Sequence, residues 1–180
     1  CSITGFGHTG PYAARPGYDA LVQAMGGVMS LTGEPAGEPM KIGVSIADLM
    51  SGMYAGVSIL AAVNHQRNTG KGQHIDISML DTHVAWLANQ GMNYLATGDV
   101  PERLGNNHPN IVPYQVMPTA DGHFVLSVAN DATFQRFCKV ADCEQLLEDA
   151  RFATAVERVR NRDVVTETLN DITRARPSAW

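Results

Sequence analysis

The chain has 180 residues, of which 44% are hydrophobic and 17% are charged, and its formal net charge is −5. This length and hydrophobic fraction suffice for one domain with a core, or for one domain and part of another. The negative charge without a basic run argues against nucleic-acid binding. The most apolar segment, residues 53–63, contains Gly and Ser and is shorter than the roughly 18 residues that a membrane span requires, so no membrane contact is expected.

The cysteines and histidines indicate neither a disulfide framework nor a metal site. The three cysteines, Cys1, Cys138 and Cys143, are odd in number, and the C-x4-C spacing of the last two has no matching pair. None of the six histidines forms an H-E-x-x-H motif. No signal-peptide pattern opens the chain, so a reduced, cytoplasmic setting is expected. Both ends of the sequence interrupt recognisable patterns, and we expect the chain to be a fragment.

The first half of the chain predicts helices interrupted by glycine. After a strand end at residues 1–4, residues 18–29 predict a helix broken at Gly26-Gly27, and residues 33–39 an exposed loop. A long helix is expected from residue 45 to 66, with Ser45-x-x-Asp48 as a capping box and Gly70 as its stop signal. Its predicted apolar face consists of Ile46, Leu49, Met50, Met53, Val57, Leu60 and Ala61.

The second half changes character near residue 110. Residues 74–79 alternate like a half-buried strand, and residues 80–97 predict a helix that ends at Gly98. A hairpin over residues 114–118 and 123–128 follows, then short helices at 133–141, 144–148 and 154–174. We therefore expect two domains, residues 1–110 and residues 111–180.

One glycine-rich segment has the spacing of a dinucleotide fingerprint. Gly5-Phe-Gly-His-Thr-Gly10 matches G-x-G-x-x-G, which binds a pyrophosphate when a helix begins at the third glycine. Pro11 follows here and no helix pattern begins, so a glycine-rich loop after a strand is the better interpretation.

Asp48 is the carboxylate with the most informative surroundings. It lies among small and apolar residues, including Ala47, Ser51 and Gly52, in the first turn of the predicted long helix. An acid there stabilises the helix dipole, which is a sufficient structural explanation. A carboxylate with a reference pKa of about 3.9 is also ionised at neutral pH and can act as a nucleophile without a general base. Both interpretations are open from the residues alone.

A second candidate segment joins a cation to an aromatic hydroxyl. Arg15-Pro16-Gly17-Tyr18 and the following Asp19 read either as a turn that leads into a helix or as a clamp for an anionic ligand. The residues alone favour the turn.

Several segments together resemble the family III CoA-transferases, whose relatives include formyl-CoA transferase, carnitine CoA-transferase and α-methylacyl-CoA racemase. The matching segments occur in order along nearly the whole chain: residues 2–7, 15–19, 43–52, 69–73, 75–81, 103–107, 119–122 and 149–152. The resemblance implies an α/β fold with a Rossmann-like large domain, partly present in residues 1–110, and a smaller α+β domain, partly present in residues 111–180. It also implies that two subunits interlock as a homodimer.

The resemblance further implies an enzyme that moves CoA between an acyl-CoA donor and a carboxylic acid acceptor. Asp48 aligns with the family's catalytic aspartate, and Arg15, Pro16, Gly17 and Tyr18 align with a stretch that contacts CoA. CoA and acyl-CoA would be substrates, and no tightly bound cofactor is expected.

Two departures from the family patterns bear on the reaction. The racemase branch carries His where this chain has Tyr18, and Tyr, with a reference pKa near 10, is a poor acid/base replacement, which favours CoA transfer over racemisation. Formyl-CoA transferase has a run of glycines where this chain has residues 108–113, so either oxalate is not the acceptor or this loop works differently. An isomerase and a non-catalytic domain are the alternative functions.

Overall fold

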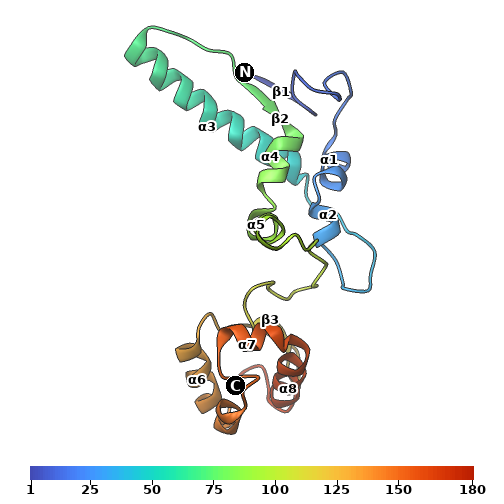
Figure 1. Ribbon diagram of the computed structural model, residues 1–180, viewed down its shortest axis with the longest axis vertical. Helices are drawn as coiled ribbons and strands as arrows, with labels where there is room; N and C mark the ends of the chain where they lie inside the picture. The colour runs from blue at the N-terminus through green and yellow to red at the C-terminus, as the bar shows by residue number, and fades with distance from the viewer. The chain divides into compact units, whose positions relative to one another are not determined.

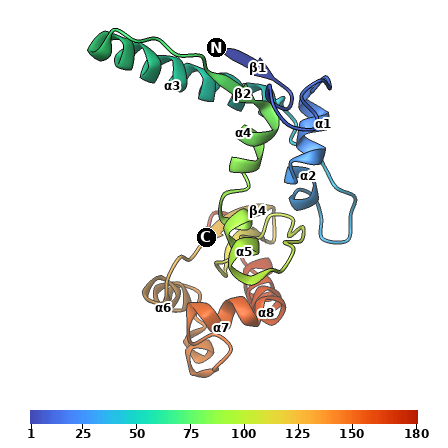
Figure 2. The same cartoon turned by 45° about the horizontal axis from the view of Figure 1, so that its top comes forward.

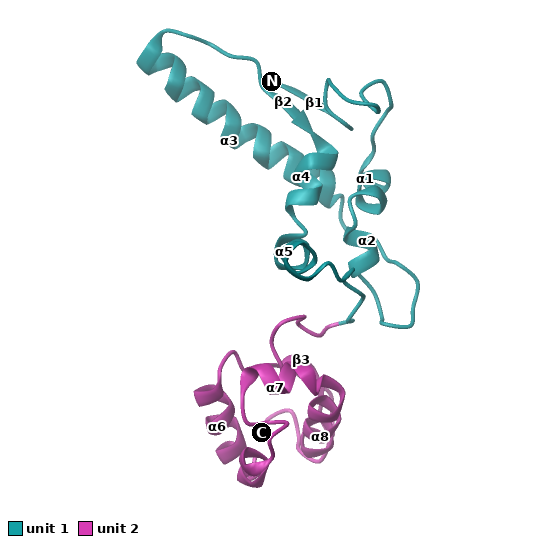
Figure 3. Cartoon of the chain, viewed as in Figure 1, with its two compact units in different colours: residues 1–105 teal, residues 106–180 magenta.

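The computed structural model describes all residues from 1 to 180 and divides them into two compact units, residues 1–105 and residues 106–180 (Figure 3). The domain boundary expected near residue 110 lies close to this division. The assignment of the units to the large and small domains of a CoA-transferase stays a prediction.

The first unit combines a small parallel sheet with five helices (Figure 1). Its elements are β1 (Ser2–Thr4), α1 (Asp19–Met25), α2 (Val28–Leu31), α3 (Ile46–Thr69), β2 (Asp76–Ser78), α4 (Met79–Ala85) and α5 (Ala88–Thr97). β1 and β2 pair in parallel with Ile3 opposite Ile77, and the chain between them contains α3, as a parallel pair requires a long crossover. The mixed helix and sheet content agrees with the predicted α/β class.

The long helix α3 buries a different face from the one predicted. Its buried residues are Ala47, Ser51 and Ala55, whereas large apolar residues of the predicted face are between 54% and 72% exposed: Leu49, Met53, Val57 and Leu60. Small side chains allow α4 to approach closely, and the Ser51 and Thr82 hydroxyl oxygens are 3.0 Å apart across this contact. Apolar periodicity therefore identified the helix correctly but not the face that packs within this chain.

By length and composition alone, α3 could cross a membrane. It has 24 residues, its most apolar window of 18 residues has a mean hydropathy of 1.6, and 17% of that window is buried. The expectation that no segment reaches this length was wrong, because it treated Gly and Ser as interruptions and the helix continues through them. Core helices of water-soluble proteins meet the same criteria, so one such helix is weak evidence for a membrane span.

The helix expected over residues 80–97 is in fact two helices. The last turn of α4 tightens through hydrogen bonds from the Trp86 and Leu87 amides to the carbonyls of His83 and Val84. Ala88 then has a φ of 47°, and α5 continues in a new direction to Gly98, whose φ of 79° ends it (Figure 2). The stop at Gly98 was predicted from glycine's tolerance of the left-handed region, whereas an alanine there gives no such signal.

The second unit is a hairpin packed against helices. Its elements are β3 (Tyr114–Pro118), β4 (His123–Ser127), α6 (Asp131–Val140), the 3-10 helix η1 (Glu144–Glu148), α7 (Ala155–Arg160) and α8 (Arg162–Arg174). The strands pair antiparallel, which confirms the predicted hairpin. The helix expected over residues 154–174 is interrupted at Asn161, where the backbone leaves helical geometry at φ −107° and ψ 30°.

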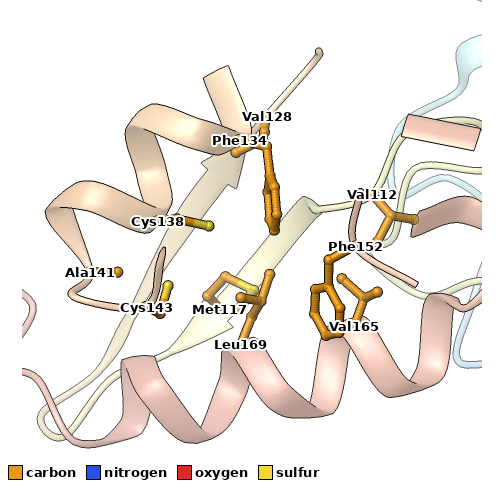
Figure 4. Close-up of a cluster of buried hydrophobic side chains, with 10 residues drawn as sticks. All are labelled: Val112, Met117, Val128, Phe134, Cys138, Ala141, Cys143, Phe152, Val165 and Leu169. Atoms are coloured by element: carbon orange, nitrogen blue, oxygen red, sulfur yellow. The ribbon is translucent and has the colours of Figure 1, made fainter. Parts of the chain in front are cut away.

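A continuous apolar core holds the second unit together (Figure 4). Met117 from β3, Phe134 from α6 and Leu169 from α8 are all fully buried in it, and the rings of Phe134 and Phe152 lie 6.4 Å apart. The Arg158 side chain of α7 lies beside this core with 1% of its surface exposed. Its guanidinium donates to the carbonyls of Val112 and Phe152 and to the Asp131 carboxylate at 2.8–3.0 Å, so each of its three nitrogens has an acceptor.

Candidate functional site

The glycine-rich loop after β1 packs directly against the Arg15–Tyr18 segment. A Cβ added to Gly17 would lie 2.3 Å from the Gly5 Cα, and a Cβ added to Gly5 would lie 2.5 Å from the Gly17 Cα. The first helix after β1 begins only at Asp19, so no helix amides face the loop as a dinucleotide fingerprint requires. The interpretation of residues 5–10 as a loop is confirmed. Its first glycine, Gly5, lets the backbone at Gly17 pack directly against the loop.

Replacement of Gly17 by alanine should therefore destabilise the first unit. No flexible side chain can move aside at this contact, because the clashing atoms belong to the backbone of Gly5. Overpacking of this kind costs about 1–3 kcal/mol, which urea unfolding of Gly17→Ala would measure. Gly52→Ala is the matched control, since its Cβ would meet no atom within 4 Å and should stabilise α3 slightly. Equal stability of the two variants would contradict the close contact.

The Arg15–Tyr18 segment presents its side chains to the surface. Arg15 and Pro16 are exposed, and Tyr18 is 73% exposed at the N-cap of α1. The Arg15 guanidinium carbon lies 4.2 Å above the centre of the Tyr12 ring, a cation–π geometry that leaves the N–H edges of the guanidinium free. The segment is thus a backbone-anchored turn with an exposed cation and hydroxyl, so the turn and clamp interpretations are compatible.

Asp48 lies in the first turn of α3 with its side chain exposed. The predicted capping box is wrong, because the Ser45 side chain accepts no hydrogen bond from the start of α3. The acceptor comes from α1 instead: the Asp19 carboxylate accepts a hydrogen bond of 2.8 Å from the amide of Ala47. Tyr18 directly precedes Asp19, and Asp48 directly follows Ala47. This hydrogen bond therefore joins the two candidate segments.

Gln23 extends this connection to the loop before α3. Its side chain is fully buried, donates to Asp19 at 2.7 Å and accepts from the Ile42 amide at 2.8 Å. It also lies 3.4 Å from the Val44 carbonyl oxygen. Gln23 was not a candidate residue from the sequence. Its only signal was a polar residue on the inner side of a short helix, four residues after an acid.

Open space lies beside Asp48 along α3. Gly52 is one helical turn from Asp48, and a Cβ placed on Gly52 would meet nothing within 4 Å. On the packed side, the Ser51 hydroxyl donates to the Ala47 carbonyl at 2.7 Å and contacts Thr82. The turn that carries Asp48 is thus fixed on its buried side and leaves room for a ligand on its exposed side.

His83 is a buried imidazole close to Asp19. It is 1% exposed, and neither ring nitrogen has a hydrogen-bond partner. Its ring packs closely against Gly26, since a Cβ added to Gly26 would lie 2.6 Å from the His83 Cδ2. Burial lowers the pKa of His83 below its usual 6.5, and the Asp19 carboxylate offsets part of that shift. A single histidine within a helix pattern gives no sequence signal for an uncharged imidazole in the core.

The stability of the first unit should rise with pH through the range just below 6.5. The unfolded chain binds a proton at His83 near the ordinary pKa, whereas the folded chain binds it only at lower pH, so stability is lost as pH falls towards the lowered pKa. Amide hydrogen exchange in α4 at several pH values would measure this dependence. His83→Leu should flatten it, whereas the exposed control His65→Leu should not. An unchanged slope in His83→Leu would contradict the prediction.

The comparisons with known proteins agree over the whole chain. The family model described as "CoA-transferase family III" matches residues 1–180. The chain belongs to CoA-transferase family III. Among curated relatives, succinate–glutarate CoA-transferase of Agrobacterium fabrum is 52% identical over 94% of this chain and 42% of its own length. Human succinyl-CoA:glutarate CoA-transferase is 39% identical over 95% of this chain and 39% of its own length. Acetyl-CoA:oxalate CoA-transferase of Acetobacter aceti is 40% identical over 99% of this chain and 46% of its own length.

Solved structures give the same family and a similar extent. A CaiB/BaiF family protein from Brucella suis is 49% identical with a TM-score of 0.77, and the match covers 99% of this chain and 47% of that one. A hypothetical protein from Mycobacterium tuberculosis is 28% identical with a TM-score of 0.83, and the match covers 98% of this chain and 47% of that one. This family III chain thus spans less than half the length of the relatives it matches.

Three of the segments that carry the resemblance hold loops in place in this family III chain. Arg103 donates to the carbonyls of Glu34 and Gly37, which ties the exposed loop of residues 33–39 to the segment after α5. Asp121 in the hairpin turn accepts from the Ser178 amide at 2.6 Å, and this hydrogen bond lowers the pKa of its carboxyl. Asp149 and Arg151 form a fork-shaped ion pair next to the buried Phe152. These motifs therefore have structural explanations within the chain.

Proposed function

We propose that this protein moves CoA from an acyl-CoA donor to a carboxylic acid acceptor through a covalent intermediate on Asp48. The observation that carries the proposal is the position of Asp48: an exposed carboxylate on a helical turn whose backbone is fixed by Asp19 and Ser51. Membership of CoA-transferase family III supports the reaction class.

The chemistry needs only a nucleophile and positioned groups. The Asp48 carboxylate attacks the donor thioester carbonyl, the C–S bond breaks, and a mixed anhydride and CoA thiolate form. The thiolate attacks the aspartyl carbonyl, which releases the donor acid and leaves an aspartyl-CoA thioester. The acceptor carboxylate attacks this thioester to form a second anhydride, and the thiolate then takes the acceptor acyl group and regenerates Asp48. Because each step exchanges one activated acyl bond for another, no ATP is required.

The Arg15–Tyr18 segment supplies groups suited to CoA. The exposed guanidinium of Arg15 fits a phosphate bidentately, and its contact with the Tyr12 ring holds it in place. Tyr18 offers an exposed hydroxyl at the start of α1, close in sequence to the Asp19 link with α3. We propose that Arg15, Pro16, Gly17 and Tyr18 line the CoA path to Asp48.

The relatives' names suggest dicarboxylic acids as substrates. The relative named succinate–glutarate CoA-transferase is 52% identical to this chain, so succinyl-CoA as donor and glutarate as acceptor are the first pair to test. Oxalate belongs in the acceptor panel, because a relative named acetyl-CoA:oxalate CoA-transferase is 40% identical. The homodimer, the cytoplasmic location and the lack of a tightly bound cofactor stay predictions.

Trapping the intermediate tests the proposal. Full-length protein is incubated with succinyl-CoA, quenched with hydroxylamine and digested for mass spectrometry. A hydroxamate on Asp48 is expected, because hydroxylamine reacts with an acyl anhydride or thioester but not with a free carboxylate. No adduct with any donor of a panel would contradict covalent transfer. Exchange of a substrate α-hydrogen with deuterated solvent, without an adduct, would identify the isomerase alternative instead.

A further inference from the structure

We infer that Asp19 and Gln23 are positioning residues for Asp48, acting through the backbone at the start of α3. This inference rests on the proposed function of Asp48 as nucleophile. Neither side chain needs to touch substrate. Gln23 was not a candidate from the sequence, and Asp19 was noted there only as the residue that follows the Arg15–Tyr18 segment.

The hydrogen bonds form a chain from α1 to the segment that begins α3. The Asp19 Oδ1 accepts from the Ala47 amide at 2.8 Å, and its Oδ2 accepts from the Gln23 Nε2 at 2.7 Å. The Gln23 Oε1 in turn accepts from the Ile42 amide at 2.8 Å. Both ends of residues 42–47 are thereby tied to α1, and Asp48 is the next residue along the chain.

No alternative partner can replace this connection at the start of α3. Ser45 occupies the N-cap position but its side chain makes no capping bond, so the Ala47 amide depends on Asp19 for its acceptor. Ala47 and Gln23 are both fully buried, so water cannot substitute without rearrangement. Loss of the Asp19 acceptor should therefore loosen the turn that holds Asp48, and small misplacements of a nucleophile have large effects on rate.

The connection also fixes Asp48 relative to the Arg15–Tyr18 segment. Asp19 directly follows Tyr18, and Gly17 is held against Gly5 by close backbone contact. The same carboxylate thus sets the spacing between the segment proposed to contact CoA and the residue proposed to attack the thioester. A fault at Asp19 should appear in the chemical step more than in the affinity for CoA.

The direction of the hydrogen bonds gives a specific test. In Asp19→Asn, the new amide oxygen can still accept from Ala47, but the new amide nitrogen then faces the donor nitrogen of Gln23. Turning the Gln23 amide moves the conflict to the Ile42 amide, so one donor always faces another. Adding Gln23→Glu removes this donor–donor conflict, because the amide at position 19 would donate to the carboxylate at position 23, which also accepts from Ile42. The double variant gives up only the longer contact of 3.4 Å between position 23 and the Val44 carbonyl oxygen. The double variant has the same net charge as the wild type, since one change removes an acid and the other adds one.

The experiment measures kcat and KM for succinyl-CoA, and the yield of Asp48 hydroxamate, in the full-length protein. Asp19→Asn should lower kcat about tenfold or more with a small change in KM, Asp19→Ala should lower it at least as much, and the double variant should recover most of the loss. Asp171→Asn, an exposed acid in α8, is the control and should match the wild type. Circular dichroism of each variant verifies that it is folded.

The outcomes separate this inference from the proposed function. If the wild type forms no adduct, Asp48 is not the nucleophile and the proposed function fails. If the wild type forms the adduct and Asp19→Asn reacts at the same rate, the positioning role is wrong. A loss of rate in Asp19→Asn that the double variant does not reverse would contradict the hydrogen-bond direction on which the inference depends.

Discussion

Replacement of Asp48 by alanine should abolish CoA transfer in the full-length protein. In the proposed mechanism this carboxylate forms the covalent bond, and removal of a covalent nucleophile lowers kcat by roughly three orders of magnitude or more. Steady-state assays with succinyl-CoA and a panel of acceptors would measure the loss. CoA binding should persist, because the Arg15–Tyr18 segment and the Asp19–Ala47 hydrogen bond do not involve the Asp48 side chain.

Asp48→Asn separates catalysis from helix stability. An acid in the first turn of α3 contributes about 0.3–1 kcal/mol through the helix dipole, so Asp48→Asn should lower stability only slightly while activity disappears. Asp81→Asn, in the first turn of α4, is a matched exposed acid and should leave activity close to that of the wild type. A marked fall in stability of Asp48→Asn with unchanged turnover would identify Asp48 as a structural helix acid.

Replacement of Arg158 by methionine should cause the largest loss of stability in the second unit. The change leaves the buried carbonyls of Val112 and Phe152 without their donor and removes the partner of Asp131. Each buried carbonyl left without a donor costs about 1–3 kcal/mol, so the two together account for most of the expected loss, whereas Asp131 is half exposed and can be solvated. Urea unfolding, with hydrogen exchange in α6 and α8 to report on this unit, would measure the difference.

Arg160→Met provides the control from the same helix. Arg160 forms an exposed ion pair with Glu157 three residues earlier, and such pairs contribute about 0–1 kcal/mol. Arg158→Lys should remain destabilising, because an ammonium cannot reproduce the three directions in which the guanidinium donates. Similar stabilities for Arg158→Met and Arg160→Met would show that the buried network contributes little.

Local signals in the sequence predicted most of the helix and strand positions. Gly70 and Gly98 end α3 and α5 with φ of 73° and 79°, values that glycine adopts without strain. The hairpin around residues 120–122 and the break at Gly26-Gly27 followed from similar turn chemistry. The position of Asp48 at a helix start and that of Arg15–Tyr18 on a turn were also predictable. The roles proposed for these residues came from the resemblance to the family.

Features that depend on distant parts of the chain were not predictable. Asp19 replaces Ser45 as the acceptor at α3 although it lies 28 residues earlier than Ala47, and no local pattern connects the two. The buried face of α3 is the one with small residues, because packing against α4 is decided by how closely two backbones can approach. Arg158 is buried for the same kind of reason, since its three acceptors come from separate segments that only the folded unit brings together.

The outward apolar side chains of α3 alter how mutational tolerance should be judged along this helix. Met53, Val57 and Leu60 recur at helical spacing on a surface that nothing else in the first unit covers. At an ordinary exposed position a polar substitution is close to neutral, but a row of large apolar residues of this length is rarely left in water. Substitutions tolerated at these three positions should therefore be those tolerated in a protein interior, with size and apolarity retained, even though packing within the first unit does not bury them.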